Sequence, residues 1–188
     1  MERISETLTK NIKAFRRSKK KCVFLNKLVS SFGIKDIAYF CLRSPKDIVS
    51  KRILFTTYSE DWEDHYFSRN YNNHDPIIIE GVKSSLPLDW CKIKKQSATN
   101  EVFFNEASEF GISHKGITIP IRGAYEDLAL LSISTDMPEE DWAYTKQHLL
   151  PDLPYFGMLI HEEIIGSQIT ARKDMKNLLS PREKEVLY

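Results

Sequence analysis

The chain has 188 residues, of which 41% are apolar and 28% charged, a balance that suits one globular domain and excludes a disordered chain. Its formal net charge of +1 excludes a global positive field that would draw the whole molecule onto nucleic acid or an anionic membrane. We expect a cytoplasmic protein, because the three cysteines form no C-x-x-C pair and the sequence has neither a signal-peptide core nor an apolar run of ~20 residues.

Two helices are predicted at the start of the chain. Apolar residues recur at helical spacing over residues 4–16, and a second helical pattern covers residues 23–29 and stops at Gly33. The basic cluster at residues 16–21 lies between them. It is either a solvated turn or a local contact to phosphate.

A β-hairpin and a third helix are expected next. Residues 37–42 and 52–57 are rich in β-branched and aromatic residues, and the sequence at 44–47 between them is typical of a turn. Ser59 can then accept the first hydrogen bonds of a helix, and acidic residues follow it in the first turn, where they suit the helix dipole.

This third helix carries an aromatic face. Tyr58, Trp62 and Tyr66 are spaced four residues apart, so they share one side of a helix, and Pro76 holds Asp75 in an extended conformation beyond it. An indole N–H donates, a tyrosine hydroxyl donates or accepts and a carboxylate accepts, so this set fits a small ligand with carbonyls and an N–H. The alternatives that need no ligand are core packing for the rings and a turn cap for Asp75.

The next part of the chain predicts a short helix and a second hairpin. Residues 101–110 form a helical pattern that ends at Gly111. Residues 116–121 and 128–134 then alternate as two strands.

The C-terminal part predicts two more helices and a linker. Pro151 and Pro154 interrupt the helical pattern, so we expect helices near 138–149 and 152–166, the second with an apolar face that packs on the sheet or on a partner chain. Residues 168–177 are polar and predict an exposed linker. A further helix start follows at residues 180–183, five residues before the chain stops.

In its ordered motifs the chain resembles the autoinducer-binding domain of LuxR-type quorum-sensing transcription factors. The resemblance covers nearly the whole chain and is carried, in order, by Tyr58-x3-Trp62-x3-Tyr66, Asp75-Pro76, Trp90, Phe110-Gly111-Ile112, Gly116-Ile117-Thr118-Ile119-Pro120 and Ser132-Ile133-Ser134. Residues 179–187 look like the opening of the family's helix-turn-helix domain.

The resemblance implies the fold and the division of the chain. It implies an α/β class, an α/β/α sandwich with a central antiparallel sheet of about five strands flanked by helices, similar to GAF and PAS domains. Residues 1–167 would be the autoinducer-binding domain, residues 168–179 an interdomain linker, and residues 180–188 the start of a truncated helix-turn-helix DNA-binding domain.

The resemblance also implies a ligand, an N-acyl homoserine lactone, and no cofactor. Trp62 would donate to the lactone carbonyl, Asp75 would accept the amide N–H, and Tyr58 with Ser132 would bond the acyl carbonyl. The pocket walls and the acyl chain contacts would come from Tyr66, Trp90, Ile77, Tyr39, Cys41, Ile53, Phe55, Phe103, Leu128 and Leu130, although a shift of one residue in strand register would turn the strand positions to the other face.

Two positions depart from the family pattern. Ile77 stands where some members carry a threonine that adds a bond to the acyl carbonyl, and an isoleucine cannot make it. Glu126 stands where many members place a glycine in the hairpin turn, so the turn is reshaped if that glycine served a positive φ.

The expected role is a sensor that acts as a homodimer and reaches DNA and RNA polymerase only through a full-length protein. The alternatives are a ligand-independent dimerisation module, an orphan regulator of a different small molecule, and a lactone-processing enzyme that uses Asp75 with His65 or His74 as a base. No nucleophile elbow accompanies that acid, so we expect no enzyme, and the histidine spacing predicts no metal site.

Overall fold

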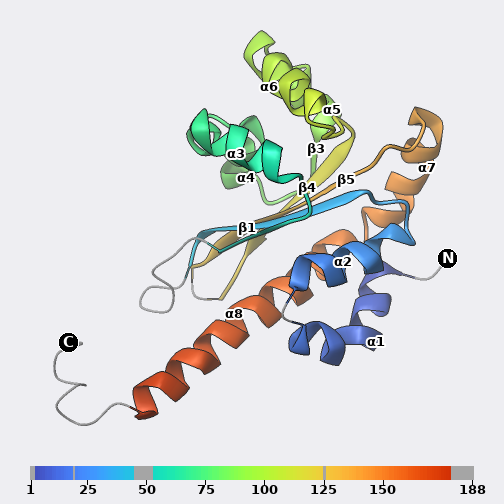
Figure 1. Ribbon diagram of the computed structural model, residues 1–188. Helices are drawn as coiled ribbons and strands as arrows, with labels where there is room; N and C mark the ends of the chain where they lie inside the picture. Colours follow the sequence, from blue (N-terminus) through green and yellow to red (C-terminus); the bar gives the residue numbers. More distant parts are fainter. Residues whose placement is uncertain (1–2, 19, 45–52, 125, 179–188) are drawn as a thin grey trace.

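A central antiparallel sheet separates two layers of helices (Figure 1). The structure is a computed structural model, which describes residues 3–18, 20–44, 53–124 and 126–178. Within these ranges the sheet has five strands in the order β2-β1-β5-β4-β3. The expected α/β class, with helices flanking an antiparallel sheet, is therefore confirmed.

Both expected hairpins are present in the sheet, which is built from β1 (Asp36–Arg43), β2 (Ile53–Thr56), β3 (Leu88–Asp89), β4 (Gly116–Arg122) and β5 (Leu128–Ser134). Residues 45–47 of the first expected turn lie outside the described residues. In the second turn, Glu126 has φ +61°, the left-handed conformation that a glycine adopts at no cost. The turn therefore keeps a positive φ with a glutamate, and the Arg43 Nε–H donates to the Glu126 carbonyl (2.6 Å).

One face of the sheet is covered by α1 (Ile4–Arg17), α2 (Lys21–Ser30) and α8 (Leu153–Leu178), with α7 (Glu139–Leu149) leading into α8 (Figure 1). The larger hydrophobic core lies here, and its buried side chains come from these helices and from alternate strand positions. The Asp152 carboxylate ties α1 to the start of α8, because it accepts from the Ser5 backbone N–H (2.8 Å) and hydroxyl (2.5 Å).

Helix α8 is longer than the sequence pattern predicts. The expected end near residue 166 is wrong, because the backbone stays helical through residues 168–177 to Leu178. These residues are mostly good helix formers, and a helix needs no apolar periodicity once it has been nucleated. The expected division into domain, linker and truncated second domain stays a prediction, and residues 180–188 lie outside the described residues.

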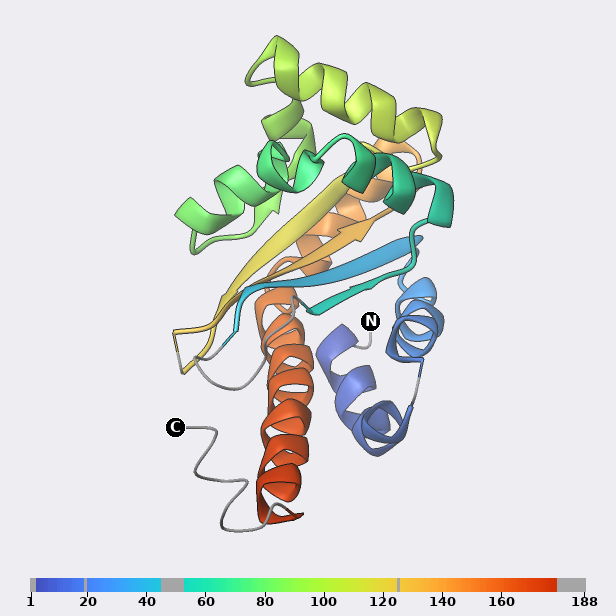
Figure 2. The same cartoon turned by 60° about the vertical axis from the view of Figure 1, so that its left-hand side comes forward.

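The opposite face carries α3 (Glu60–Ser68), the 3-10 turn η1 (Tyr71–Asn73), α4 (Pro76–Lys83), α5 (Trp90–Lys94) and α6 (Ala98–Glu109), which Figure 2 shows from the side. The Ser59 hydroxyl caps α3 as expected, accepting from the Trp62 N–H (3.2 Å). Helix α6 begins three residues earlier than expected and ends before Gly111, whose φ is +81°. Helix α4 was not expected, and neither was η1, which lies between α3 and α4.

Strand register decides which residues face which layer. Ala38 of β1 pairs with Ser132 of β5 and with Thr56 of β2, and Phe40 pairs with Leu130 and Leu54. Directly opposed residues point to the same side of a sheet, so all six side chains face α3, α4 and α6. The intervening residues face the larger core.

Candidate functional site

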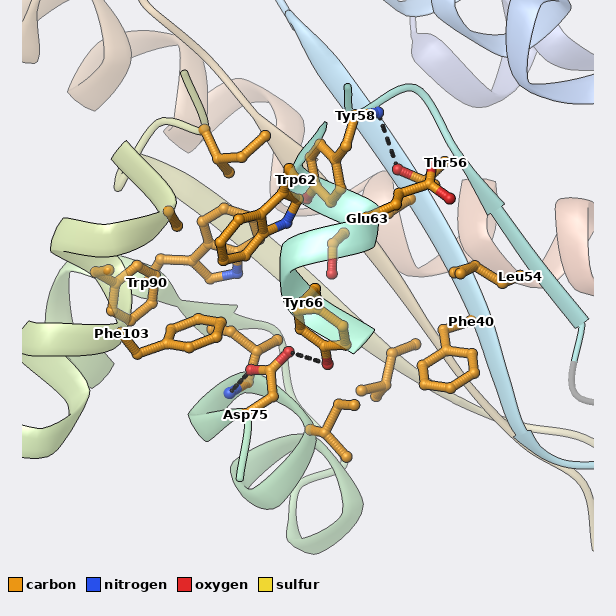
Figure 3. Close-up of a pocket in the computed structure, with 18 of the residues that line it drawn as sticks. Phe40, Leu54, Thr56, Tyr58, Trp62, Glu63, Tyr66, Asp75, Trp90 and Phe103 are labelled. Carbon is orange, nitrogen blue, oxygen red and sulfur yellow. Dashed lines mark hydrogen bonds between the residues drawn. The ribbon is translucent and has the colours of Figure 1, made fainter. Parts of the chain in front are cut away.

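A cavity of about 110 Å³ lies between the sheet and the layer of α3, α4 and α6 (Figure 3). A single water needs roughly 10–15 Å³ of such space, so the cavity has room for a small molecule. Its wall is largely apolar and is formed by Ala38, Phe40, Leu54, Thr56, Tyr58, Trp62, Glu63, Tyr66, Phe67, Asp75, Ile77, Ile78, Trp90, Phe103, Phe104, Ala107, Ile112, Leu130 and Ser132.

Nine of the fourteen site residues expected from the sequence line this cavity: Tyr58, Trp62, Tyr66, Asp75, Ile77, Trp90, Phe103, Leu130 and Ser132. Residues separated by up to 74 positions in the chain are thus brought to one place. Leu128 is buried at the start of β5 but is not part of the wall.

The other four expected wall residues lie on the wrong side of the sheet. Tyr39, Cys41, Ile53 and Phe55 pack in or against the core formed with α1, α2 and α8. The strand positions were chosen one residue out of register, and a shift of one residue exchanges the two faces. Their neighbours Ala38, Phe40, Leu54 and Thr56 form the wall instead. Ser132 was expected in the pocket, so its pairing with Ala38 would have shown that Ala38, and not Tyr39, faces the cavity. Strand pairing cannot be read from one sequence.

Trp62 presents an unpaired donor to the cavity. The residue is 4% exposed, and its backbone N–H is used by the cap of α3. Among the described residues, no side chain or carbonyl accepts from the indole Nε1–H. A ligand that offers a carbonyl would give this N–H a partner.

Asp75 caps a helix, as the structural alternative expected, and it also lines the cavity. Its backbone is extended before Pro76 (φ −60°, ψ 116°), and Oδ1 caps α4 by accepting from the Ile77 N–H (2.7 Å). Oδ2 accepts from the Tyr66 hydroxyl (2.8 Å), which Figure 3 shows beside the cavity. Burial raises the pKa of Asp75 to about 6, although these hydrogen bonds oppose the shift. The carboxylate retains capacity for one more donor.

Two hydroxyls complete the polar set. Tyr58 is the residue that leads into α3, its hydroxyl has no partner among the described residues, and burial raises its pKa. On the sheet, the Trp90 Nε1–H donates to Thr118 Oγ1 (2.8 Å), and Ser132 Oγ lies 2.8 Å from the same oxygen. Because Thr118 accepts from the indole, its own proton can go to Ser132, which leaves the Ser132 O–H free to donate into the cavity.

Charge in the wall is entirely acidic. Glu63 is a second carboxyl at the cavity, and burial together with Glu60 and Asp64 raises its pKa. The described wall residues include no lysine, arginine or histidine. Two carboxyls without a base disfavour an anionic ligand and favour a neutral one with hydrogen-bond donors.

Comparison with known proteins finds a matching family model and several relatives of the chain. The family model "Autoinducer binding domain" matches residues 22–164. The transcriptional activator protein RaiR of Rhizobium etli is 30% identical over 131 residues, which are 68% of this chain and 53% of RaiR. The quorum-sensing regulator RhlR of Pseudomonas aeruginosa is 26% identical over 164 residues, 87% of this chain and 66% of RhlR. The chain thus spans between half and two thirds of the length of these relatives.

Solved structures share the fold. CepR2 from Burkholderia cenocepacia, described as an N-acylhomoserine lactone dependent LuxR family transcription factor, superposes with a TM-score of 0.68 at 16% identity, over 89% of this chain and 98% of that chain. SdiA of Escherichia coli superposes with a TM-score of 0.61 at 19% identity, over 97% of this chain and 75% of that chain.

Two further observations concern the described residues as a whole. None of their helices is both long and apolar enough to cross a membrane. Nor do they gather three histidine, cysteine, aspartate or glutamate side chains in an arrangement that could hold a metal ion.

With a family match over residues 22–164 and a fold shared with LuxR-type proteins, the chain belongs to the autoinducer binding domain family.

Proposed function

We propose that this chain is the signal-binding domain of a LuxR-type transcriptional regulator and that its signal is an N-acyl homoserine lactone. The observation that carries the proposal is the cavity itself, whose wall is apolar except for a few convergent polar groups. Trp62 and Ser132 offer donors and Asp75 offers an acceptor. The relatives named as transcriptional activators and the lactone dependence of CepR2 support the same conclusion.

The polar groups match the head of such a ligand. The Trp62 N–H donates to the lactone carbonyl, the Asp75 carboxylate accepts the amide N–H, and Tyr58 with Ser132 bonds the acyl carbonyl. Both carbonyls and the amide N–H of the head then have a partner, which strongly polar groups of a buried ligand require. The acyl chain lies against apolar wall residues such as Phe40, where Ile77 adds surface but no hydrogen bond.

The proposal also includes dimerisation and DNA binding, as the response of the regulator to its signal. Tyr155 and Met158 are exposed apolar side chains on α8, at helical spacing, and they suit contact with a second copy of the chain. Specific DNA recognition and contact with RNA polymerase require a full-length protein with its helix-turn-helix domain. Such a regulator works in the cytoplasm, and it is not an enzyme.

The proposal is tested by expression with a panel of N-acyl homoserine lactones. Denaturing extraction and mass spectrometry are expected to recover intact ligand at about one molecule per chain. Trp62→Phe and Asp75→Asn are expected to weaken binding by roughly 1–3 kcal/mol each, because each removes a buried partner of the ligand. Asp61→Asn, an exposed acid on α3, is the matched control and is expected to bind normally.

Other outcomes would overturn parts of the proposal. Unchanged affinity in both variants would remove the assigned head-group roles. Recovery of ring-opened product with turnover would point to a lactone-processing enzyme. If no ligand is recovered and no member of the panel shifts the melting temperature, the chain is a ligand-independent dimerisation module.

A second candidate ligand is a neutral acyl ester that lacks the lactone. SdiA, which shares the fold, has been solved in complex with octanoyl-rac-glycerol. Glycerol hydroxyls can donate to Asp75 and Glu63 and carry no negative charge, so they suit this acidic wall. Octanoylglycerol belongs in the same extraction panel, and its recovery in preference to every lactone would identify an orphan regulator.

A further inference from the structure

Glu106 of α6 joins three elements through one carboxylate oxygen. Oε2 accepts from the Tyr71 hydroxyl of η1 (2.5 Å), and His65 Nε2 of α3 lies 3.1 Å from the same atom. These two contacts lower the pKa of Glu106, so it is ionised at neutral pH and His65 Nε2 carries the proton of that bond. Glu106 is not part of the cavity wall.

Both partners of Glu106 pack against the Trp62 indole. The His65 ring stacks on Trp62 with centroids 5.9 Å apart and planes at 26°, and the Tyr71 ring lies 6.2 Å away at 33°. The Phe110 ring contacts both, with its centroid 4.6 Å from that of His65 and 5.5 Å from that of Trp62. Holding these rings therefore holds the plane of the indole, and with it the direction of the unpaired Nε1–H.

The contact between Glu106 and Tyr71 also connects Glu106 to Asp75, because the Tyr71 backbone bonds the Asp75 backbone. The Tyr71 carbonyl accepts from the Asp75 N–H (2.7 Å) and from the His74 N–H (2.8 Å). Tyr71 is thus fixed at its hydroxyl by Glu106 and in turn fixes the start of the segment that carries the Asp75 carboxylate. Trp62 and Asp75 are the two groups that the proposed ligand uses for its lactone and its amide.

We propose that Glu106 is a positioning residue for the head-group site, acting through Tyr71 and His65 on Trp62 and Asp75 without touching the ligand. The inference rests on the proposed function, because it concerns how the same ligand is oriented. The Glu106 side chain is 26% exposed, so its removal opens no core cavity, and its effect is expected on ligand geometry more than on folding. A small misplacement of such groups costs much of their hydrogen-bond energy.

The test compares four variants with an N-acyl homoserine lactone. Glu106→Ala is expected to weaken binding about tenfold, because both donors lose their acceptor. Tyr71→Phe, which removes a single oxygen and leaves the ring in place, is expected to weaken it about threefold. Glu106→Gln retains an acceptor oxygen and is expected to restore most of the affinity. Glu109→Ala, an exposed glutamate on the same helix, is the control and is expected to bind as the unchanged chain does.

Two readouts separate positioning from a merely structural role. Repeated in a Trp62→Phe background, Glu106→Ala is expected to cost clearly less than in the unchanged chain, because part of what it positions is already gone. The indole N–H resonance of Trp62, assigned by its loss in Trp62→Phe, is expected to shift in Glu106→Ala and to stay in place in Glu109→Ala.

The outcomes distinguish this inference from the proposed function. If the unchanged chain binds no lactone, the proposed function fails. If the unchanged chain binds and Glu106→Ala binds equally well, only the positioning role is overturned. If Glu106→Ala loses the same factor in both backgrounds, its action on Trp62 is overturned. Should Glu106→Ala fail to fold, Tyr71→Phe with the indole resonance decides.

Discussion

At the scale of a residue, the Asp75 carboxyl makes ligand binding depend on pH. Burial raises its pKa from 3.8 to about 6 in the ligand-free domain, so the folded state binds more protons than the unfolded state between these values. The sign follows from linkage: the stability of the ligand-free domain falls as pH rises from about 4 to about 6, and the cost persists above that. A ligand N–H that donates to the ionised carboxylate favours the charged form and lowers the pKa again.

Ligand affinity should therefore rise with pH, with release of a proton on binding. We expect the dissociation constant to be about tenfold larger at pH 5 than at pH 7.5, measured by titration calorimetry in buffers of different ionisation enthalpy. Asp75→Asn should bind more weakly and lose most of this dependence. Glu63→Gln removes the other carboxyl of the wall and should retain it. A flat profile in the unchanged chain would contradict the assigned role of Asp75.

At the scale of elements, the contact between α5 and the sheet depends on a residue without a side chain. A Cβ built on Gly116 of β4 would lie 2.5 Å from the Trp90 ring and 2.7 Å from the Ile133 carbonyl oxygen of β5. The backbone oxygen cannot move without separating β4 from β5. We expect Gly116→Ala to lower the free energy of unfolding by about 1–3 kcal/mol, measured by urea denaturation, and to disturb the Trp90 bond to Thr118.

The control for this prediction is Gly166→Ala in α8. Among the described residues, nothing outside the backbone of the helix itself lies within 4 Å of a Cβ built there. Alanine is favoured over glycine inside a helix by roughly 0.5–1 kcal/mol, so this variant should be neutral or more stable. If Gly116→Ala were as stable as the unchanged chain, the close approach of Trp90 to β4 would be wrong.

The helices and strands also differ in how far the sequence could predict them. Local signals were sufficient for α1, for the cap of α3 and for both hairpins, because periodicity and turn residues act over a few positions. Helix α4 was missed because Pro76 restricts Asp75 to an extended conformation and is at the same time a favoured first helical residue. The wall positions on β1 and β2 depended on strand pairing, which is set by distant residues.

At the scale of the molecule, the sheet divides two hydrophobic cores. The larger core lies on the side of α1, α2 and α8, and the cavity with the Trp62 donor lies on the side of α3, α4 and α6. A ligand that fills the cavity binds only the folded chain and stabilises it by linkage. At a hundred times the dissociation constant this amounts to about 2.7 kcal/mol, or a rise in melting temperature of roughly 5–10 °C for a chain of this size.

The stabilisation should be unequal on the two sides of the sheet, because only one layer touches the ligand. Hydrogen exchange with and without ligand is expected to show the larger gain of protection in α3, α4 and α6 and a smaller one in α1 and the first half of α8. Trp62→Phe, compared at the same ligand concentration, should reduce both the thermal shift and the gain in α3. Equal protection on both faces would mean that the two cores open as one unit, and greater protection in α8 than in α3 would place the ligand elsewhere.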